Sequence, residues 1–102
     1  MDVPAIWNDF FQRWPEKLNR RGVVVTTYGE QIAFNDFLRH EHAILLERQA
    51  PDSMGGRKVV LPFHKIDCVK ITDPVDSTIF KSAGFIPLAK TAPGSASRPV
   101  AT

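Results

Sequence analysis

The stretch "GVVVTTYGEQIAF", residues 22–34, carries the clearest structural signal in this chain. Its first half is a run of β-branched residues, and further apolar residues follow the short segment "YGEQ". β-Branched and aromatic side chains favour extended strands, and a glycine such as Gly29 accommodates the positive φ angle of a tight turn. The stretch therefore predicts two strands joined by a turn, at about 23–28 and about 31–38.

The same texture continues toward the C-terminus in "HAILLER" and "RKVVLPFHKIDCVKIT". The segment between them, "QAPDSMGGR", is rich in turn-forming residues, so it predicts a loop between a strand that ends near Arg48 and one that begins near Lys58. Pro62 removes a backbone donor and favours a bend, and a strand at about 66–72 follows almost at once. Five strands within about residues 22–72 indicate a mainly β fold, with a corner of the kind that small barrels contain.

Two helices flank the predicted strands. The first, at about 3–19, is indicated by apolar residues that recur near the period of 3.6 that lines one side of a helix. These residues are Ile6, Trp7, Phe10, Phe11, Trp14 and Leu18. Pro15 is expected to kink or restart this helix. The second helix, short and at about 74–83 in "DPVDSTIFKSAGF", is expected to begin at the cap Asp73 and to end at Gly84.

One small domain accounts for the whole chain. The sequence has 102 residues, of which 43% are apolar and 24% charged, and this length leaves no room for a second domain. We expect the domain over residues 1–90, with Phe85, Ile86 and Leu88 packed back on the barrel. Residues 91–102, "TAPGSASRPVAT", are small and polar, with nothing to bury, and are predicted to form a flexible tail.

Charge and composition exclude several classes of protein. The 13 basic and 11 acidic residues give a net charge of +2, which is too balanced to indicate a nucleic-acid partner by itself. No apolar run approaches the ~20 residues that span a bilayer, and the N-terminus lacks the pattern of a signal peptide. We therefore expect a cytoplasmic protein without a membrane partner. No catalytic triad, phosphate loop or nucleotide motif is present, so we expect neither an enzyme nor a cofactor.

Several of the predicted strands are apolar on both faces. The runs "VVV", "AILL" and "VVL" do not alternate, and in the last strand Ile66 and Cys68 are predicted to face opposite to Val69 and Ile71. The aromatic helix covers only part of the outer face, so we infer a surface for self-association. Cys68 is the one cysteine, has no partner for an internal disulfide, and is expected to be a buried small apolar residue.

The order of these elements, a helix followed by five strands, resembles that of the Sm-like family, which includes the Hfq-like proteins, over roughly residues 3–72. "GVVVTTYGEQIAF" is similar to the first family motif, in which an apolar strand reaches a turn glycine, here Gly29, with an apolar position, here Ile32, three residues later. "VVLPFHKIDCVKI" is similar to the second motif, in which two apolar strands flank a short basic turn, here "HK". The aspartate and asparagine that the family places in its second and third strands have no clear equivalents around "FNDFLRHEHAI". The resemblance implies a small five-stranded SH3-like or Sm-like barrel, whose copies join through their edge strands into a homo-oligomeric ring.

The resemblance also implies that single-stranded RNA meets the turns at 35–42 and 62–66. The residues there that stack on bases or contact phosphates would be Asn35, Arg39, His40, Phe63, His64 and Lys65. A second candidate basic surface, at the end of the first helix, comprises Arg13, Lys17, Arg20 and Arg21. The alternative interpretation is that these charges form an ordinary solvated face of a non-catalytic structural or protein-interaction module with the same fold.

A third interpretation starts from "HEHAILLE", residues 40–47. His40 and His42 lie on one face of a strand, and Glu47 or the distant His64 would complete a three-ligand metal site. The pattern resembles the first motif of the cupins and implies a small metal-binding cupin-like enzyme. However, Glu47 lies an odd number of residues from His42, so it faces away in a continuous strand, and a cupin barrel needs more strands than this chain supplies. A solvated turn without metal is therefore the favoured interpretation.

Overall fold

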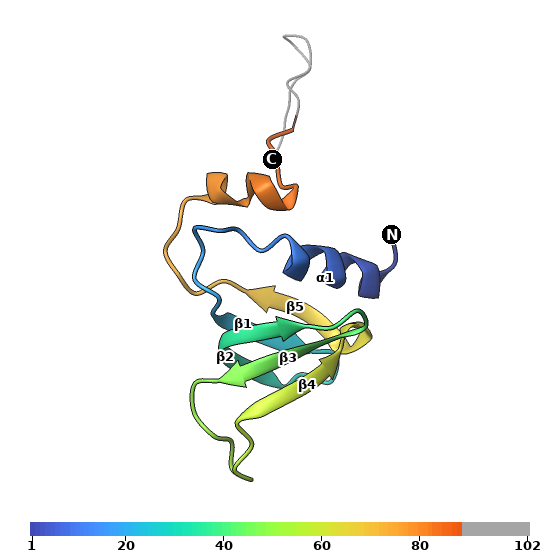
Figure 1. Cartoon of the computed structure of the whole chain (residues 1–102), viewed down its shortest axis with the longest axis vertical. Helices are drawn as coiled ribbons and strands as arrows, with labels where there is room; N and C mark the ends of the chain where they lie inside the picture. The colour runs from blue at the N-terminus through green and yellow to red at the C-terminus, as the bar shows by residue number, and fades with distance from the viewer. Residues whose placement is uncertain (89–102) are drawn as a thin grey trace.

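The computed structural model describes residues 1–88, which form a five-stranded antiparallel sheet with an N-terminal helix (Figure 1). In chain order the elements are α1 (Val3–Gln12), β1 (Gly22–Thr26), β2 (Gln31–Arg39), β3 (Ala43–Arg48), β4 (Lys58–Pro62), the 3₁₀ turn η1 (Phe63–Lys65), β5 (Ile66–Lys70) and the 3₁₀ helix η2 (Ser77–Ala83). The predicted mainly β fold with an N-terminal helix is confirmed. The predicted flexible tail, residues 91–102, lies outside the described residues. Within residues 1–88, none of the helices has the length and apolar character needed to cross a membrane.

The strands lie in the order β4-β3-β2-β1-β5, and every neighbouring pair is antiparallel. The first four strands pair in chain order, and β5 crosses over to pair with β1. β4 and β5 are therefore the two edges of the sheet, although only the 3 residues of η1 separate them in the chain. The sheet must curve, because so short a connection holds the end of one edge close to the start of the other.

The core lies between the inner face of the sheet and α1. Its most deeply buried apolar strand residues are Val24, Ile32, Phe34, Phe37, Ile44, Leu46, Leu61 and Ile66. α1 contributes Phe11, whose ring centroid lies 5.0 Å from that of Phe37 and 6.2 Å from that of Phe63 in η1. Trp7 Nε1 donates a hydrogen bond to the carbonyl oxygen of Ile66 at 3.1 Å. Aromatic packing and this hydrogen bond therefore help to fix α1 on the sheet.

The first helix is shorter than the sequence predicts, since α1 ends at Gln12 rather than near residue 19. Pro15 explains the early end, because a proline disfavours the α conformation at the residue before it. The segment that follows is still packed: Leu18 is 3% exposed, and its carbonyl oxygen accepts a hydrogen bond from Trp14 Nε1 at 3.1 Å. Helical spacing thus identified packed residues correctly but overstated the length of the helix.

A β-bulge changes the predicted facing of the last strand. Val25 of β1 pairs with Cys68 and Thr26 pairs with Ile66, so Asp67 has no partner in this ladder. The extra residue sends Ile66 into the core and leaves Cys68 beside Val25 on the outer face. Cys68 is accordingly half-buried rather than buried. The prediction that Ile66 and Cys68 share one face was wrong, because a bulge breaks the alternation on which it relied.

The short C-terminal helix begins later than predicted. η2 starts after Asp76, whose carboxylate caps it by accepting a hydrogen bond from a backbone N–H two residues on, at 2.8 Å. The expected cap, Asp73, instead accepts hydrogen bonds from the side chains of Asn19 and Arg21. Gly84 ends η2 with a φ of 96°, at the predicted position.

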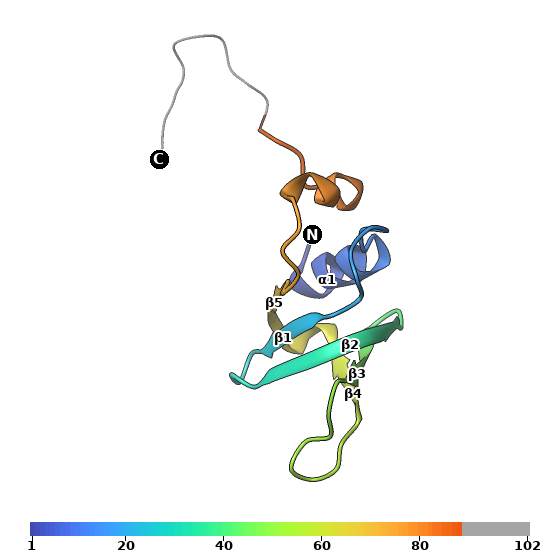
Figure 2. The same cartoon turned by 90° about the vertical axis from the view of Figure 1, so that its left-hand side faces the viewer.

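The residues after Gly84 do not pack on the sheet. The exposed fractions are 58% for Phe85, 69% for Ile86 and 94% for Leu88. Figure 2 shows the reason, since α1 lies between η2 and the sheet. Phe85 therefore meets α1, where its ring centroid lies 6.0 Å from that of Phe10. The expectation that this segment packs back on the strands was wrong, and its apolar side chains form a separate surface.

Candidate nucleic-acid interface

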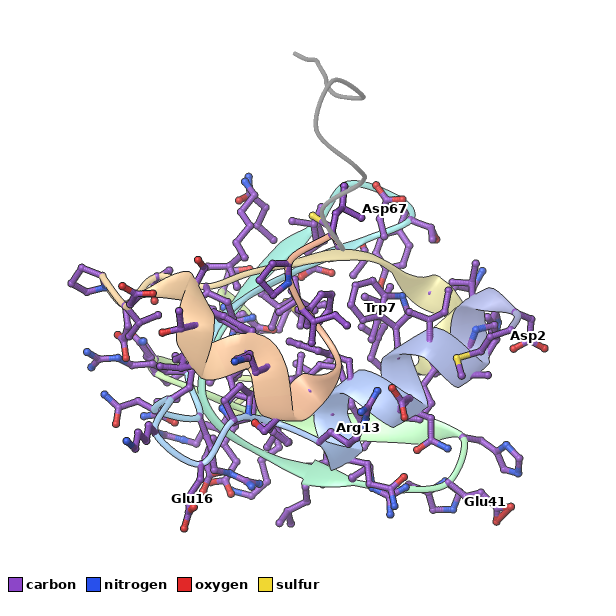
Figure 3. The ribbon with its side chains drawn as sticks, turned by 90° about the horizontal axis from the view of Figure 1, so that it is seen from above. Asp2, Trp7, Arg13, Glu16, Glu41 and Asp67 are labelled. Carbon is purple, nitrogen blue, oxygen red and sulfur yellow. The ribbon has the colours of Figure 1, made fainter. Side chains whose placement is uncertain are left out.

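Two turns and the first half of α1 meet at one end of the sheet. Phe63 N of η1 donates a hydrogen bond to the carbonyl oxygen of His42, in the β2–β3 turn, at 3.1 Å. His42, Glu41 and His64 line a hollow of about 430 Å³ together with residues from the N-terminal half of α1. Figure 3 shows two of its lining residues, Asp2 and Glu41, on the same side of the molecule. The two turns in which the sequence placed an RNA-contacting surface are therefore neighbours.

Hydrogen bonds hold the β2–β3 turn in one conformation. His40 N donates to Ala43 O at 2.9 Å, and His40 Nδ1 accepts a hydrogen bond from His42 N at 3.0 Å. Both histidines are exposed, and their ring centroids lie 5.8 Å apart. Since His64 shares the hollow with His42, all 3 histidines of the chain lie around this end of the sheet. Imidazoles stack on unpaired bases and, when protonated, donate to phosphates.

Arg39 and Lys65 are the permanent cations next to His40 and His64 in the chain. Arg39, the last residue of β2, donates from Nη1 to Asn8 Oδ1 of α1 at 2.7 Å, which keeps its guanidinium at the junction of sheet and helix. Lys65 is exposed in η1. Asp2 and Glu41 bring two negative charges to the hollow beside these residues. Attraction of a phosphate therefore depends on the individual side chains rather than on a broad positive field.

Two of the predicted RNA-contacting residues lie elsewhere. Phe63 is 1% exposed and its ring packs on Phe11 in the core, so no base can stack on it. Asn35 is exposed at a bulge in β2, and the residues between it and Arg39 span about 13 Å of strand. His42 and His64 share the hollow, His40 lies beside His42, and Arg39 bonds to Asn8 of the same hollow. Together with Lys65, which follows His64 in η1, we call these residues the turn surface.

The second predicted basic surface is largely neutralised by ion pairs. Arg13 pairs with Asp9 at 2.8 Å, and Arg21 pairs with Asp73 at 2.8 Å. Of the four predicted residues, three form ion pairs, and Lys17 forms none in the described part of the chain. A guanidinium already paired with a carboxylate gains less from a phosphate, because the two anions compete for the same donors.

Arg20, the fourth member of that set, is the most firmly held. Its guanidinium lies 4.0 Å from the centroid of the Phe37 ring, donates to Asp36 Oδ1 at 2.7 Å and also donates to the carbonyl oxygen of Phe37. The hydrogen bond from Arg20, followed in strength by one from Phe37 N, lowers the pKa of Asp36 below the ordinary value of an aspartate. Arg20 therefore fastens the segment after α1 to β2, and it is not a free phosphate contact.

The four side chains of the metal hypothesis do not converge. Glu47 lies on β3 opposite Lys58, with 3.8 Å between Oε1 and Nζ, at the end of the strand remote from His40 and His42. Within residues 1–88, no group of three or more histidine, cysteine, aspartate or glutamate side chains is placed to hold a metal ion. The geometry therefore gives the cupin-like interpretation no support.

Sequence reasoning missed the part that α1 plays at this end of the sheet. Asn8 receives the hydrogen bond from Arg39, and Asp2 lines the hollow. The helical spacing that identified the aromatic core treats polar helix positions as solvated, so it gave no reason to place these two beside a turn far away in the chain. A long-range contact of this kind has no local signal in the sequence.

Comparisons of the chain with protein-family models, curated proteins and solved structures found no match. The candidate interface therefore rests on its geometry alone. That geometry consists of two turns held together by a backbone hydrogen bond, with the 3 histidines and Arg39 around them, on a sheet whose edge strands within residues 1–88 are β4 and β5.

Proposed function

We propose that copies of this chain assemble through β4 and β5 into a closed ring of Sm-like small barrels, and that the turn surface binds single-stranded RNA. The observation that carries the proposal is the strand order, in which β4 and β5 are the two edges of one sheet. An edge strand presents a row of backbone donors and acceptors, and pairing β4 of one copy with β5 of the next satisfies both rows. Such a head-to-tail contact gives a ring when its rotation closes.

The outer face of the sheet supports the same contact. Leu38, Leu45 and Val60 are direct cross-strand partners on β2, β3 and β4, and they form an apolar row that reaches the β4 edge. Leu38 is 58% exposed and Val60 is 67% exposed. At the other edge, Cys68 and Val25 are partners on the outer face. Pairing β4 with β5 of the next copy joins the two rows and removes from water apolar surface that a single copy exposes.

A disulfide across the interface tests the ring. Val60 and Cys68 are the middle residues of two strands of 5 residues each, so centred pairing sets them opposite one another on the outer face. Opposite residues of neighbouring strands have Cβ atoms about 4.5–5.5 Å apart, close to the separation that a disulfide needs. We expect Val60→Cys to give a ladder of cross-linked oligomers on mild oxidation, and the ladder should end at one discrete size.

Two variants control for random cross-linking. Val59→Cys places the new thiol one residue away on the inner face, where Val59 pairs with the core residue Leu46. Val60→Cys combined with Cys68→Ala removes the partner thiol, so it should stop at dimers. The ring is contradicted if light scattering finds the native chain monomeric and Val60→Cys cross-links no faster than Val59→Cys.

RNA binding needs a separate measurement, the affinity of a single-stranded oligonucleotide as a function of salt. Arg39→Ala and Lys65→Ala should each weaken binding and reduce the slope of log K against log salt by about 0.7, the share of one phosphate contact. Arg57→Ala is the matched control, because Arg57 is exposed in the β3–β4 loop at the opposite end of the sheet. A discrete oligomer without salt-dependent RNA affinity would contradict this half of the proposal and favour the interaction-module interpretation.

A further inference from the structure

A hollow of about 670 Å³ lies between η2 and a side of α1 that the sheet leaves uncovered. Its walls are mainly apolar and come from Phe10 of α1, Phe80 of η2, and Phe85 and Ile86 of the segment that follows η2. Hollows of about 300–1,000 Å³ with apolar walls and a few polar groups are typical of small-molecule sites. The size and the lining of this hollow therefore fit a small ligand.

The hollow exists because α1 is apolar on two adjoining sides. Trp7 and Phe11 pack toward the sheet, whereas Val3, Ile6 and Phe10 recur at spacings of three and four along the neighbouring side. η2 covers this second side only near Phe10, and Val3 and Ile6 remain 52% and 45% exposed. An apolar helix side that is half covered leaves room beside the covering element.

The outer wall of the hollow is positioned by a turn that requires glycine. Gly84 has a φ of 96°, which reverses the chain after η2, and Phe85 N then donates to Phe80 O at 3.1 Å. The Phe85 ring meets the rings of Phe80 and Phe10 edge to face, at 6.3 and 6.0 Å between centroids. Arg13 lies against the same turn, because a Cβ added at Gly84 would come within 2.7 Å of its Nη2 (Figure 3). The walls are therefore formed before any ligand arrives.

We propose that this hollow binds a small amphipathic carboxylate, with its apolar body among Phe10, Phe80 and Phe85 and its carboxylate at Lys81. Lys81 is the one charged side chain that lines the hollow in the described part of the chain, and Ser77 and Thr78 are its hydroxyl-bearing lining residues. The described lining thus holds one cation and no acidic residue in a mainly apolar wall, which favours a ligand with one negative charge on an apolar body. A medium-chain fatty acid has that chemistry.

This site is independent of the proposed ring and of the turn surface, because none of the residues that line it lies on β4, on β5 or in either turn. It also has internal reporters. The Phe10 ring lies 5.3 Å from that of Trp14 and 6.2 Å from that of Trp7, so a ligand in contact with Phe10 should change the tryptophan fluorescence.

The test is titration of the full chain with decanoate below its critical micelle concentration, monitored by calorimetry and by tryptophan fluorescence. Decan-1-ol serves as the uncharged comparison. We expect one decanoate for each chain. Lys81→Gln should weaken decanoate about two- to five-fold, the value of one exposed ion pair, and leave decan-1-ol unchanged. Lys17→Gln, which removes the same charge from an exposed residue outside the hollow, should change neither affinity.

Phe85→Ser tests the apolar wall and should weaken both ligands, and the variant should still fold because Phe85 is 58% exposed. The proposal is overturned if the full chain binds no decanoate, or if Lys81→Gln and Lys17→Gln have the same effect. It is also overturned if Phe85→Ser lowers the solution mass of a native oligomer, since a second copy would then occupy the hollow.

Discussion

α1 presents apolar residues to two different environments, and the two sides differ in how completely they are covered. Toward the sheet, Phe11 is 3% exposed among the aromatic rings of the core. On the adjoining side, Val3 is 52% exposed and Ile6 is 45% exposed, and Phe10 is half-buried beneath Phe85. The residue types are similar on both sides. What differs is the covering element, which is a sheet of five strands on one side and a short 3₁₀ helix on the other.

This difference indicates that one side of α1 contributes mainly to folding stability and the other to binding a partner. A ring enclosed on every side contributes its full burial to folding, whereas a half-covered side retains apolar area that a further partner can bury. We therefore expect the sheet side of α1 to carry most of the folding free energy and the η2 side to carry ligand binding. Substitutions on the two sides of α1 test this division.

The largest effect is expected from Phe11→Ala compared with Phe10→Ala. Phe11 is fully enclosed, so its truncation should lower the free energy of unfolding by about 3–5 kcal/mol. Phe10 is only half-buried, so its truncation should cost about 1 kcal/mol while weakening decanoate binding. Urea denaturation of both variants measures the two costs. Equal costs would show that η2 and the hollow belong to the folding core, and the division would be wrong.

The next effect compares two glycines with positive φ, 86° at Gly29 and 96° at Gly84. Alanine at either position should cost about 1–2 kcal/mol, because an L-residue is strained there. Gly29 joins β1 to β2, so its cost should lower the global free energy of unfolding. Gly84 ends η2, so Gly84→Ala should instead speed hydrogen exchange within residues 77–88 and leave the exchange rates in the sheet unchanged. Faster exchange in the sheet of the Gly84→Ala variant would contradict a separate η2.

A smaller effect is expected from the hydrogen bond that joins Trp7 of α1 to β5. Trp7→Phe removes the hydrogen bond to Ile66 O and should cost about 1 kcal/mol, which lowers the melting temperature by about 4–8 °C in a domain of this size. Trp14→Phe is the matched control, because its lost bond to Leu18 O lies within one local segment. Unchanged melting of the Trp7→Phe variant would mean that this hydrogen bond does not help to hold the helix on the sheet.

Local residues explain what the sequence could predict of the fold. The strand end at Arg48, the strand start at Lys58 and the helix end at Gly84 match the structure, because turn residues act on their immediate neighbours. The facing of Cys68 was missed, because the bulge at Asp67 depends on how β5 pairs with β1 and no local residue type marks it.

The candidate site shows the same limit. The turns that carry His40 and His64 lie next to one another, and their contact with RNA stays a prediction. Two of the carboxylates that pair with the basic surface after α1, Asp36 and Asp73, come from distant parts of the chain. Arg21, for example, pairs with Asp73 across 52 residues. Counting positive charges along the sequence does not reveal which carboxylates pair with them in the fold.

The sheet on one side of α1 and η2 on the other each contain an aspartate with a lowered pKa, so their responses to acid can be compared. Hydrogen bonds from Arg20 and from Phe37 N lower the pKa of Asp36 on β2, and hydrogen bonds from Thr78 lower the pKa of Asp76 at the start of η2, both from an ordinary value of 3.8. A folded pKa below the unfolded one gives stabilisation that is present above the unfolded pKa and is lost as the pH falls through the folded pKa. The loss from Asp36 should be under about 1 kcal/mol, because its side chain is 49% exposed and screened by water.

The stabilisation that Asp36 loses in acid should lower the global free energy of unfolding. The stabilisation that Asp76 loses should only make η2 open more easily. Urea denaturation can be measured on either side of pH 4, about the unfolded pKa of an aspartate. On acidification the free energy of unfolding should fall less for Asp36→Asn than for the native chain. Asp76→Asn keeps a good helix cap, so it should make hydrogen exchange in η2 insensitive to acid and leave the global curve unchanged. If Asp76→Asn instead flattens the global curve, η2 unfolds together with the sheet. The outer side of α1 would then be part of the folding core, and its hollow would be a packing defect rather than a site.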